Sequence, residues 1–182
     1  MRFVRFVRTI AITVVLAAAA AAIVWVLQTD TSSQPTTIEA GTATVEWVID
    51  GDTVDLIIDG QQERIRLIGI DAPESVSHET PVQCFGQEAS LALKGLLPVG
   101  ADVRLERDQE TRDRFGRLLL YLYRADDNLF VNRWLVENGY ADALFFEPNT
   151  AYRREFTELR NTARSTPLGL WANCDGPDQP LE

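Results

Sequence analysis

Three short clusters of acidic and basic residues occur at ordered intervals in a stretch that otherwise has the pattern of β-strands. They are residues 49–54 (IDGDTV), residues 66–74 (RLIGIDAPE) and residues 113–117 (DRFGR). Carboxylate oxygens are the ligands that a hard cation prefers, and guanidinium groups hold the charge that a phosphoryl group carries in its transition state. The combination indicates hydrolysis of phosphodiester bonds.

Two aspartates are candidates for a metal site. Asp52 follows the first predicted turn and Asp71 ends the third predicted strand, so adjacent strands can bring both carboxylates to one end of a barrel. Such a pair can hold Ca²⁺, with a backbone carbonyl and waters completing the shell. Taken alone, the same residues also fit a simple Asp50-Gly51-Asp52 turn and a loop cap before Pro73.

Two arginines accompany these acids. Arg66 lies five residues before Asp71 on the same predicted strand, and Arg117 opens a later strand after Phe115 and Gly116. The planar fork of arginine can hold two phosphate oxygens and stays charged at any working pH. A single strand arginine is usually a solvated surface residue, but two arginines that share a barrel end with three acids exceed what structural pairing needs.

Glu74, beyond Pro73, is the candidate base that orients or deprotonates an attacking water. Without its neighbours it would be an ordinary surface glutamate. His78 is the only histidine, and we expect it to be a loop residue. No histidine-based nucleophilic mechanism is therefore available.

The elements that must position these residues follow from apolar periodicity and turn signals. The sequence predicts strands at residues 42–49, 53–58, 62–70, 101–107 and 118–124, and helices at 86–97, 131–138 and 150–165. Five strands with one helix between the third and fourth is the order of the OB-fold, a small Greek-key barrel. We therefore expect an α+β fold, mainly β, with a five-stranded barrel and three helices.

The N-terminus has the features of a membrane segment. Arg2, Arg5 and Arg8 precede an uncharged run at residues 9–28, about the ~20 residues that span a bilayer. The positive flank predicts that the N-terminus stays in the cytoplasm and the rest is exported. Residues 1–28 are either an uncleaved signal anchor, which the continued apolar run at residues 23–27 favours, or a signal peptide cut near Ala22.

The remaining boundaries follow from composition. Residues 29–41 are rich in Thr, Ser, Gln, Pro and Gly and predict a disordered linker. Residues 42–174 form the predicted domain, and residues 175–182 a flexible tail.

Charge limits the mode of substrate binding. The chain has a net charge of −10, and without the three N-terminal arginines, 14 of its 17 basic residues face 27 acidic ones, a net charge of −13. Such a surface does not attract a polyanion overall. Nucleic-acid binding would depend on a local basic site and on bound cations.

Two cysteines, Cys84 and Cys174, fit the exported location because an oxidising compartment permits a disulfide. The bridge would tie the segment after the metal-site loop to the end of the last helix. A closed loop of about ninety residues is worth on the order of 4 to 5 kcal/mol in the chain-entropy model. The alternative is two unpaired thiols.

The motifs resemble the staphylococcal nuclease family. IDGDTV, RLIGIDAPE and DRFGR, followed by FVNRWLVENGYA and GLW, match its pattern from about Thr42 to Trp171. The resemblance implies an OB-fold barrel with three helices and a Ca²⁺-dependent nuclease of relaxed sequence preference that acts on DNA and RNA. We expect a monomer, attached to the membrane through its N-terminal helix or secreted.

The resemblance also implies site roles. In that family the residues matching Asp52 and Asp71, with the backbone carbonyl at the position of Ala72, ligate Ca²⁺. The residue matching Glu74 is the base or positions the water. The arginines matching Arg66 and Arg117 contact phosphate, and Asp50 matches an acid near the metal's waters.

Three positions depart from the family pattern. Ala72 replaces a threonine, which matters little if only its carbonyl is used. Two tyrosines that seat the nucleotide are Phe115 and Leu144 here. Base stacking can survive at Phe115, but nucleotide affinity should be weaker.

Three functions remain open at this level. The first is an active nuclease, secreted or anchored. The second is a non-catalytic OB-fold module that binds oligonucleotides or a protein partner at the cell envelope. The third is an envelope protein that uses Ca²⁺ only for stability. The retained acids favour the nuclease.

Overall fold

A computed structural model describes residues 38–75, 81–174 and 176–180. The chain divides into two units, and the described residues all belong to the second, residues 36–182. The predicted membrane segment 1–28, most of the predicted linker and His78 lie outside the described residues. Within the described ranges, none of the helices has the length and apolar character needed to cross a bilayer.

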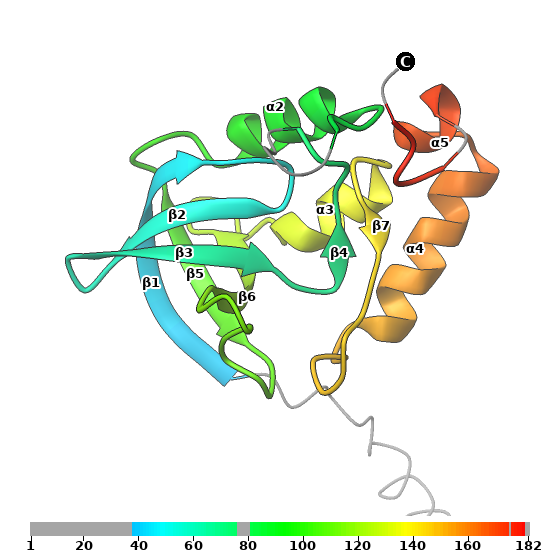
Figure 1. The fold of residues 1–182 in the computed structure, drawn as a ribbon. Helices are drawn as coiled ribbons and strands as arrows, with labels where there is room; N and C mark the ends of the chain where they lie inside the picture. Colours follow the sequence, from blue (N-terminus) through cyan, green and yellow to red (C-terminus); the bar gives the residue numbers. More distant parts are fainter. Residues whose placement is uncertain (1–37, 76–80, 175, 181–182) are drawn as a thin grey trace, which may run out of the picture. The chain divides into compact units, whose positions relative to one another are not determined.

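Five strands close into a barrel, as predicted (Figure 1). The barrel order is β1-β2-β3-β6-β5, in which β3 and β6 are parallel and the other neighbours are antiparallel. This arrangement is consistent with the OB-fold. The strands are β1 (Ile38–Val48), β2 (Thr53–Ile58), β3 (Gln61–Leu67), β5 (Asp102–Arg107) and β6 (Leu118–Arg124).

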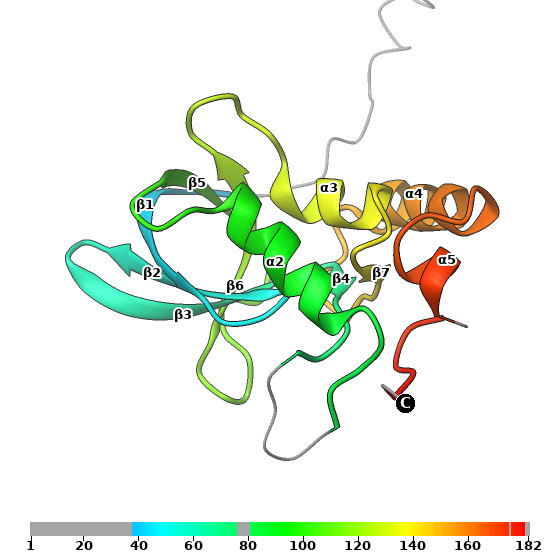
Figure 2. The ribbon, with the colours of Figure 1, turned by 90° about the horizontal axis from the view of Figure 1, so that it is seen from above.

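Three helices accompany the barrel, also as predicted: α2 (Gly86–Leu96), α3 (Val131–Glu137) and α4 (Arg153–Ser165). A further single turn, α5 (Leu170–Asn173), follows α4. Figure 2 shows α2 lying along the barrel, with α3 and α4 beside one another.

Two strand boundaries differ from the sequence prediction. β1 begins at Ile38 because residues 38–41 pair with β5, so this part of the predicted linker is a strand. The predicted third strand divides at Gly69, which has a φ of 78°. Beyond it, β4 (Ile70–Asp71) leaves the barrel and pairs with β7 (Asp142–Ala143). A left-handed residue cannot continue a strand, and glycine adopts that conformation without penalty.

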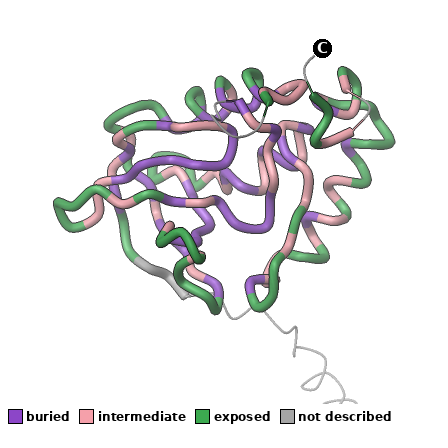
Figure 3. Tube along the Cα trace, viewed as in Figure 1, coloured by how far each residue is buried: buried purple, intermediate pink, exposed green. Residues whose placement is uncertain are grey.

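The core explains why these strands close. Alternate residues of β3 point inward, so Ile65 and Leu67 are fully buried while Arg64 faces solvent. The barrel strands contribute a large share of the buried residues, and the β2–β3 hairpin tip and the outer faces of the helices are exposed (Figure 3).

Asn132 fixes α3 against the barrel. It is fully buried, its Nδ2 donates to the carbonyls of Ile68 at 2.9 Å and Leu120 at 3.3 Å, and its Oδ1 accepts from the Leu122 N–H at 3.0 Å. It thus satisfies backbone groups of β6 and of the segment between β3 and β4. A buried backbone group without such a partner destabilises the fold.

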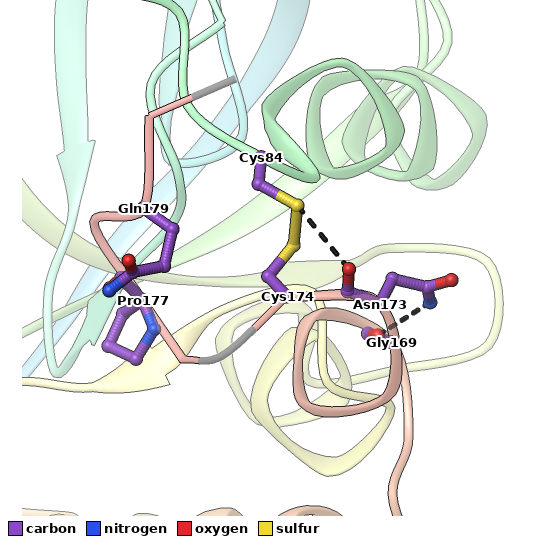
Figure 4. Close-up of a disulfide and its surroundings, with 6 residues drawn as sticks. All are labelled: Cys84, Gly169, Asn173, Cys174, Pro177 and Gln179. Atoms are coloured by element: carbon purple, nitrogen blue, oxygen red, sulfur yellow. Dashed lines mark hydrogen bonds between the residues drawn. A yellow bond between two sulfur atoms is a disulfide. The ribbon is translucent and has the colours of Figure 1, made fainter. Parts of the chain in front are cut away.

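The predicted disulfide is present. Cys84 and Cys174 are bonded with their Cα atoms 6.1 Å apart, which joins the start of α2 to the end of α5 (Figure 4). Beside it, the Cys84 N–H donates to the Gln179 carbonyl at 2.8 Å, and Gln83 Nε2 donates to Asp178 Oδ1 at 3.2 Å. Asp178 and Gln179, which belong to the predicted tail, are therefore hydrogen-bonded to the segment that precedes α2.

Replacement of Asn132 by alanine should destabilise the domain by about 2 to 4 kcal/mol, because it takes the side-chain partner from the buried Ile68 carbonyl and from the Leu122 N–H. Urea unfolding followed by circular dichroism measures the effect. Asn161→Ala, on the exposed side of α4, is the matched control and should change stability by less than about 0.5 kcal/mol. Equal effects of the two substitutions would contradict the role assigned to Asn132.

Candidate active site

The turn between β1 and β2 presents Asp52. The Ile49 N–H donates to the Thr53 carbonyl at 2.9 Å, and the Asp52 N–H donates to Asp50 Oδ1 at 3.0 Å. A Cβ on Gly51 would lie 2.6 Å from the Ala72 Cβ and 2.8 Å from the Ala89 Cβ. Glycine is therefore needed where this turn packs against the residue after Asp71 and the first turn of α2.

Arg66 brings the two predicted metal-binding aspartates together. Its Nη2 is 2.9 Å from Asp52 Oδ2 and 2.8 Å from Asp71 Oδ1. Its Nη1 donates to the carbonyls of Leu67 at 2.6 Å and Ile70 at 3.0 Å. One nitrogen thus bridges both carboxylates, and the neighbouring nitrogen holds the backbone between them.

Asp52 also fixes the backbone of Ala72. Asp52 Oδ2 accepts from the Ala72 N–H at 3.0 Å, and Asp52 Oδ1 accepts from the Thr53 hydroxyl at 3.0 Å. Asp52 is only 7% exposed. A buried carboxylate needs such partners, and they place Ala72 directly beside the Asp52 carboxylate.

The site holds more negative charge than Arg66 balances. Burial raises the pKa of Asp71 to about 6, assisted by the charge of Asp52 and opposed by Arg66. Burial and the nearby charge of Asp52 also raise the pKa of Asp50 to about 6, with a smaller contribution from Glu74. A bound cation would stabilise the ionised form of carboxyl groups whose pKa is raised in this way.

The donor set fits Ca²⁺ better than a softer metal. Carboxylate and carbonyl oxygens around Asp52, Asp71 and Ala72 match a hard cation, and Ca²⁺ accepts an irregular shell completed by water. Among the described residues, no three His, Cys, Asp or Glu side chains form a ready-made metal cluster. Backbone and water oxygens would therefore supply much of the coordination.

Glu74 is positioned through its backbone by a residue that the sequence analysis missed. The Glu74 N–H donates to Gln83 Oε1 at 2.7 Å, and the Gln83 N–H donates to the Glu74 carbonyl at 2.8 Å. A Cβ on Gly86 would lie 2.3 Å from that carbonyl oxygen. No motif marks Gln83, because its role depends on a contact with the Glu74 backbone that forms only in the folded chain.

Asp113 organises the third motif. Its Oδ2 accepts from Arg117 Nε at 2.7 Å, and its Oδ1 accepts from the backbone N–H groups of Phe115 and Arg117, each at 2.9 Å. Gly116 completes the tight turn with a φ of 83°. The predicted arginine is therefore held in place by an acid for which the sequence analysis proposed no role.

These parts meet in a cleft of about 630 Å³, which we call the main cleft. Arg66, Asp71 and Arg117 line it together with the apolar residues Phe115, Leu144 and Phe146. Phe115 and Phe146 are 70% and 72% exposed. The main cleft can thus hold a phosphate between guanidinium groups while apolar rings contact an adjoining base.

The predicted site residues fall into two groups. Arg66, Asp71, Arg117, Phe115 and Leu144 line the main cleft. Asp52 joins it through Arg66, while Asp50 and Glu74 lie within electrostatic range of one another next to Asp52. Sequence reasoning missed Phe146, which carries no motif and was placed in no predicted element.

Comparison with known proteins gives consistent matches. A family model described as "Staphylococcal nuclease homologue" matches residues 64–173. The "Thermonuclease" of Staphylococcus intermedius is 42% identical over 127 residues, which cover 70% of this chain and 74% of that protein. The "Thermonuclease" of Staphylococcus hyicus is 39% identical over 126 residues, covering 69% and 73% of the two chains. "Endonuclease YncB" of Bacillus subtilis is 35% identical over 131 residues, covering 71% and 61%.

Asp50→Asn should stabilise the domain at pH 8 by about 1 to 3 kcal/mol in the absence of divalent cations. The folded pKa of Asp50, about 6, lies above its ordinary value of 3.8. The folded state therefore binds more protons between these values, and the wild-type protein loses stability as pH rises through them. Asparagine removes this charge and keeps an Oδ1 acceptor for the Asp52 N–H.

Urea unfolding at pH 4, 6 and 8 in chelator tests this effect. The difference between Asp50→Asn and wild type should shrink toward zero near pH 4. Asp59→Asn, at an exposed position of the β2–β3 turn, is the control for the loss of a carboxylate outside the site. A constant loss of stability at all pH values in Asp50→Asn would disprove the charge explanation.

Proposed function

This chain belongs to the staphylococcal nuclease family, and on that basis we propose that it is a Ca²⁺-dependent nuclease that hydrolyses phosphodiester bonds of DNA, RNA or both with low sequence specificity. Nuclease activity is the function that its thermonuclease and endonuclease relatives support. The observation that carries the proposal is the main cleft, where Arg66, Arg117 and Asp71 face one space.

The two arginines would bind the scissile phosphate. The ion pair with Asp113 uses Nε of Arg117 and orients the side chain, so its terminal nitrogens can donate to phosphate oxygens. Arg66 is oriented by two backbone carbonyls and two aspartates, which take the hydrogens of Nη1 and Nη2, so its Nε–H is the donor that would contact phosphate. Guanidinium groups held in advance stabilise charge that develops on the phosphoryl oxygens without further reorganisation.

Asp52, Asp71 and the Ala72 carbonyl would hold the cation. When bound, Ca²⁺ supplies positive charge next to the phosphate and makes a coordinated water more acidic. Glu74 would orient that water or take its proton. Its backbone is fixed on both sides by Gln83, which restricts where the Glu74 carboxylate can reach.

The apolar residues of the main cleft would bind the bases without distinguishing one base from another. Phe115 offers an exposed ring with Arg114 Cζ 4.7 Å and Arg117 Cζ 5.5 Å from its centroid. Stacking on an aromatic face tolerates any base, which favours low sequence specificity. A non-catalytic binding module would not need Glu74 beside a cation site and two phosphate-binding arginines, so the enzyme is preferred.

We also propose that the domain lies outside the cytoplasmic membrane, anchored by residues 1–28 or released by cleavage. The positive flank and long apolar run support export, and the Cys84–Cys174 bond supports an oxidising compartment.

Mass spectrometry of the natural protein tests the location. We expect residues 9–28 to be retained in a membrane fraction and both cysteines to be oxidised, because the apolar run continues past Ala22. A mature N-terminus just after Ala22 would replace the anchor with a secreted form. A full-length cytoplasmic protein with free thiols would reject export.

The purified domain should cleave labelled single-stranded DNA in Ca²⁺ and lose at least ~99% of that activity in excess chelator, because the acidic site then lacks its cation. Mg²⁺ should restore little activity, since it demands stricter octahedral geometry. A gel assay of labelled oligonucleotides measures both effects. Unchanged cleavage in chelator would remove the metal from the proposal.

Arg117→Lys provides the matched test of the phosphate contact. Lysine keeps the charge but loses the fork, so turnover should fall by roughly a hundredfold. Arg133→Lys, on the exposed side of α3 and paired with Glu155, should leave turnover within about twofold of wild type. Similar turnover in the two variants would show that Arg117 is structural.

A further inference from the structure

A second groove lies directly beyond the wall of the main cleft. It has a volume of about 360 Å³ and is lined by Asp55, Gln62, Arg64, Phe115, Gly116 and Arg117. Phe115 and Arg117 line both the main cleft and this second groove. A nucleic-acid strand that passes over Phe115 can therefore leave the main cleft and enter the second groove.

The strand register explains why a third arginine lies there. Arg64 and Arg66 are two residues apart on β3, so both project from the outer face at a spacing of roughly 7 Å, while Ile65 and Leu67 fill the barrel. β6 runs parallel to β3 with Ile65 opposite Leu118, and continuing this register brings Arg117 beside Arg64. Arg64 therefore extends the row of phosphate-binding arginines away from the main cleft.

The Arg64 side chain is held rigidly but remains accessible. Its Nε and Nη2 donate to the two carboxylate oxygens of Asp55 at 2.8 and 3.0 Å, and Gln62 Nε2 also donates to Asp55 at 3.1 Å. Asp55 is 4% exposed, whereas the Arg64 side chain is 54% exposed. The buried acid fixes one edge of the guanidinium and leaves the rest of the group facing the groove and solvent.

Such an arrangement suits a phosphodiester. Arginine held in its bound conformation loses little entropy on contact with a ligand, and the remaining donors match phosphate oxygens. Because the whole chain carries a net charge of −10, long-range attraction cannot hold a polyanion, and affinity must come from local contacts of this kind.

We propose that the second groove is a binding site for the sugar-phosphate backbone of the same nucleic-acid strand, next to the segment that is cleaved, with Arg64 contacting a phosphate. The inference rests on the proposed nuclease function and adds a positioning residue outside the catalytic machinery. It predicts that substrates long enough to cross Phe115 bind better than a dinucleotide, which occupies the main cleft alone.

The test compares KM for a dinucleotide and for a ~12-nucleotide single strand. The paired variant Asp55→Asn with Arg64→Gln removes both charges and keeps a neutral hydrogen bond in the buried pair. The KM of the long substrate should rise roughly fivefold, and its salt dependence should weaken by about 0.7 in the log–log slope, the value for one lost phosphate contact on a single strand. The KM of the dinucleotide and both kcat values should not change.

Two further variants sharpen the result. Asp55→Asn alone keeps the charge of Arg64 but loosens its hold, and should raise the KM of the long substrate by less than the paired variant does. Arg133→Gln removes an arginine of similar exposure from α3 and should change neither KM. Thermal melts of each variant separate binding effects from loss of fold.

The outcomes are distinct. An equal change in KM for both substrates, or no change in KM for the long one, overturns the proposed binding site in the second groove. The nuclease proposal then still stands. If the wild-type protein cleaves neither substrate in Ca²⁺, the nuclease proposal fails and this inference fails with it.

Discussion

One guanidinium group holds the candidate active site together. Arg66 contacts the β1–β2 turn through Asp52, the end of β3 through the Leu67 carbonyl, and β4 through Ile70 and Asp71. The β2–β3 pairing brings these segments together, because Arg66 lies opposite Thr53 and the Leu67 N–H donates to the Asp52 carbonyl at 2.9 Å. The site is therefore a product of strand pairing, and its buried charges depend on that pairing for their partners.

The same contacts create an unbalanced charge that the fold alone does not neutralise. One arginine faces Asp52 and Asp71, with Asp50 and Glu74 nearby, and burial keeps water from screening them. A protein optimised only for stability would replace such a group with neutral residues. The retained imbalance is what would give the site its affinity for the proposed cation.

Local sequence patterns predicted much of the fold and of the site, but they missed contacts that form only when the chain folds back on itself. The strand alternation and the order of motifs placed Asp52, Arg66, Asp71 and Arg117 in their elements. The extension of β1 to Ile38 was missed because backbone pairing with β5 does not require an apolar pattern. Contacts such as Gln83 with the Glu74 backbone join residues across a loop, and no periodicity records them. The N-terminal segment lies outside the described residues, and its assignment remains a prediction.

The disulfide has a consequence for the integrity of the chain. Asp52, Arg66, Asp71 and Glu74 precede Cys84, whereas Arg117 lies between Cys84 and Cys174. A protease that cuts the exposed turn at residues 98–100 would divide the acids from this arginine in a chain without the bridge. With the bridge, both fragments stay in one covalent molecule, and the β1–β5 and β3–β6 pairings can keep the nicked barrel assembled. The bond thus protects the site against the loss of a peptide bond as well as against unfolding.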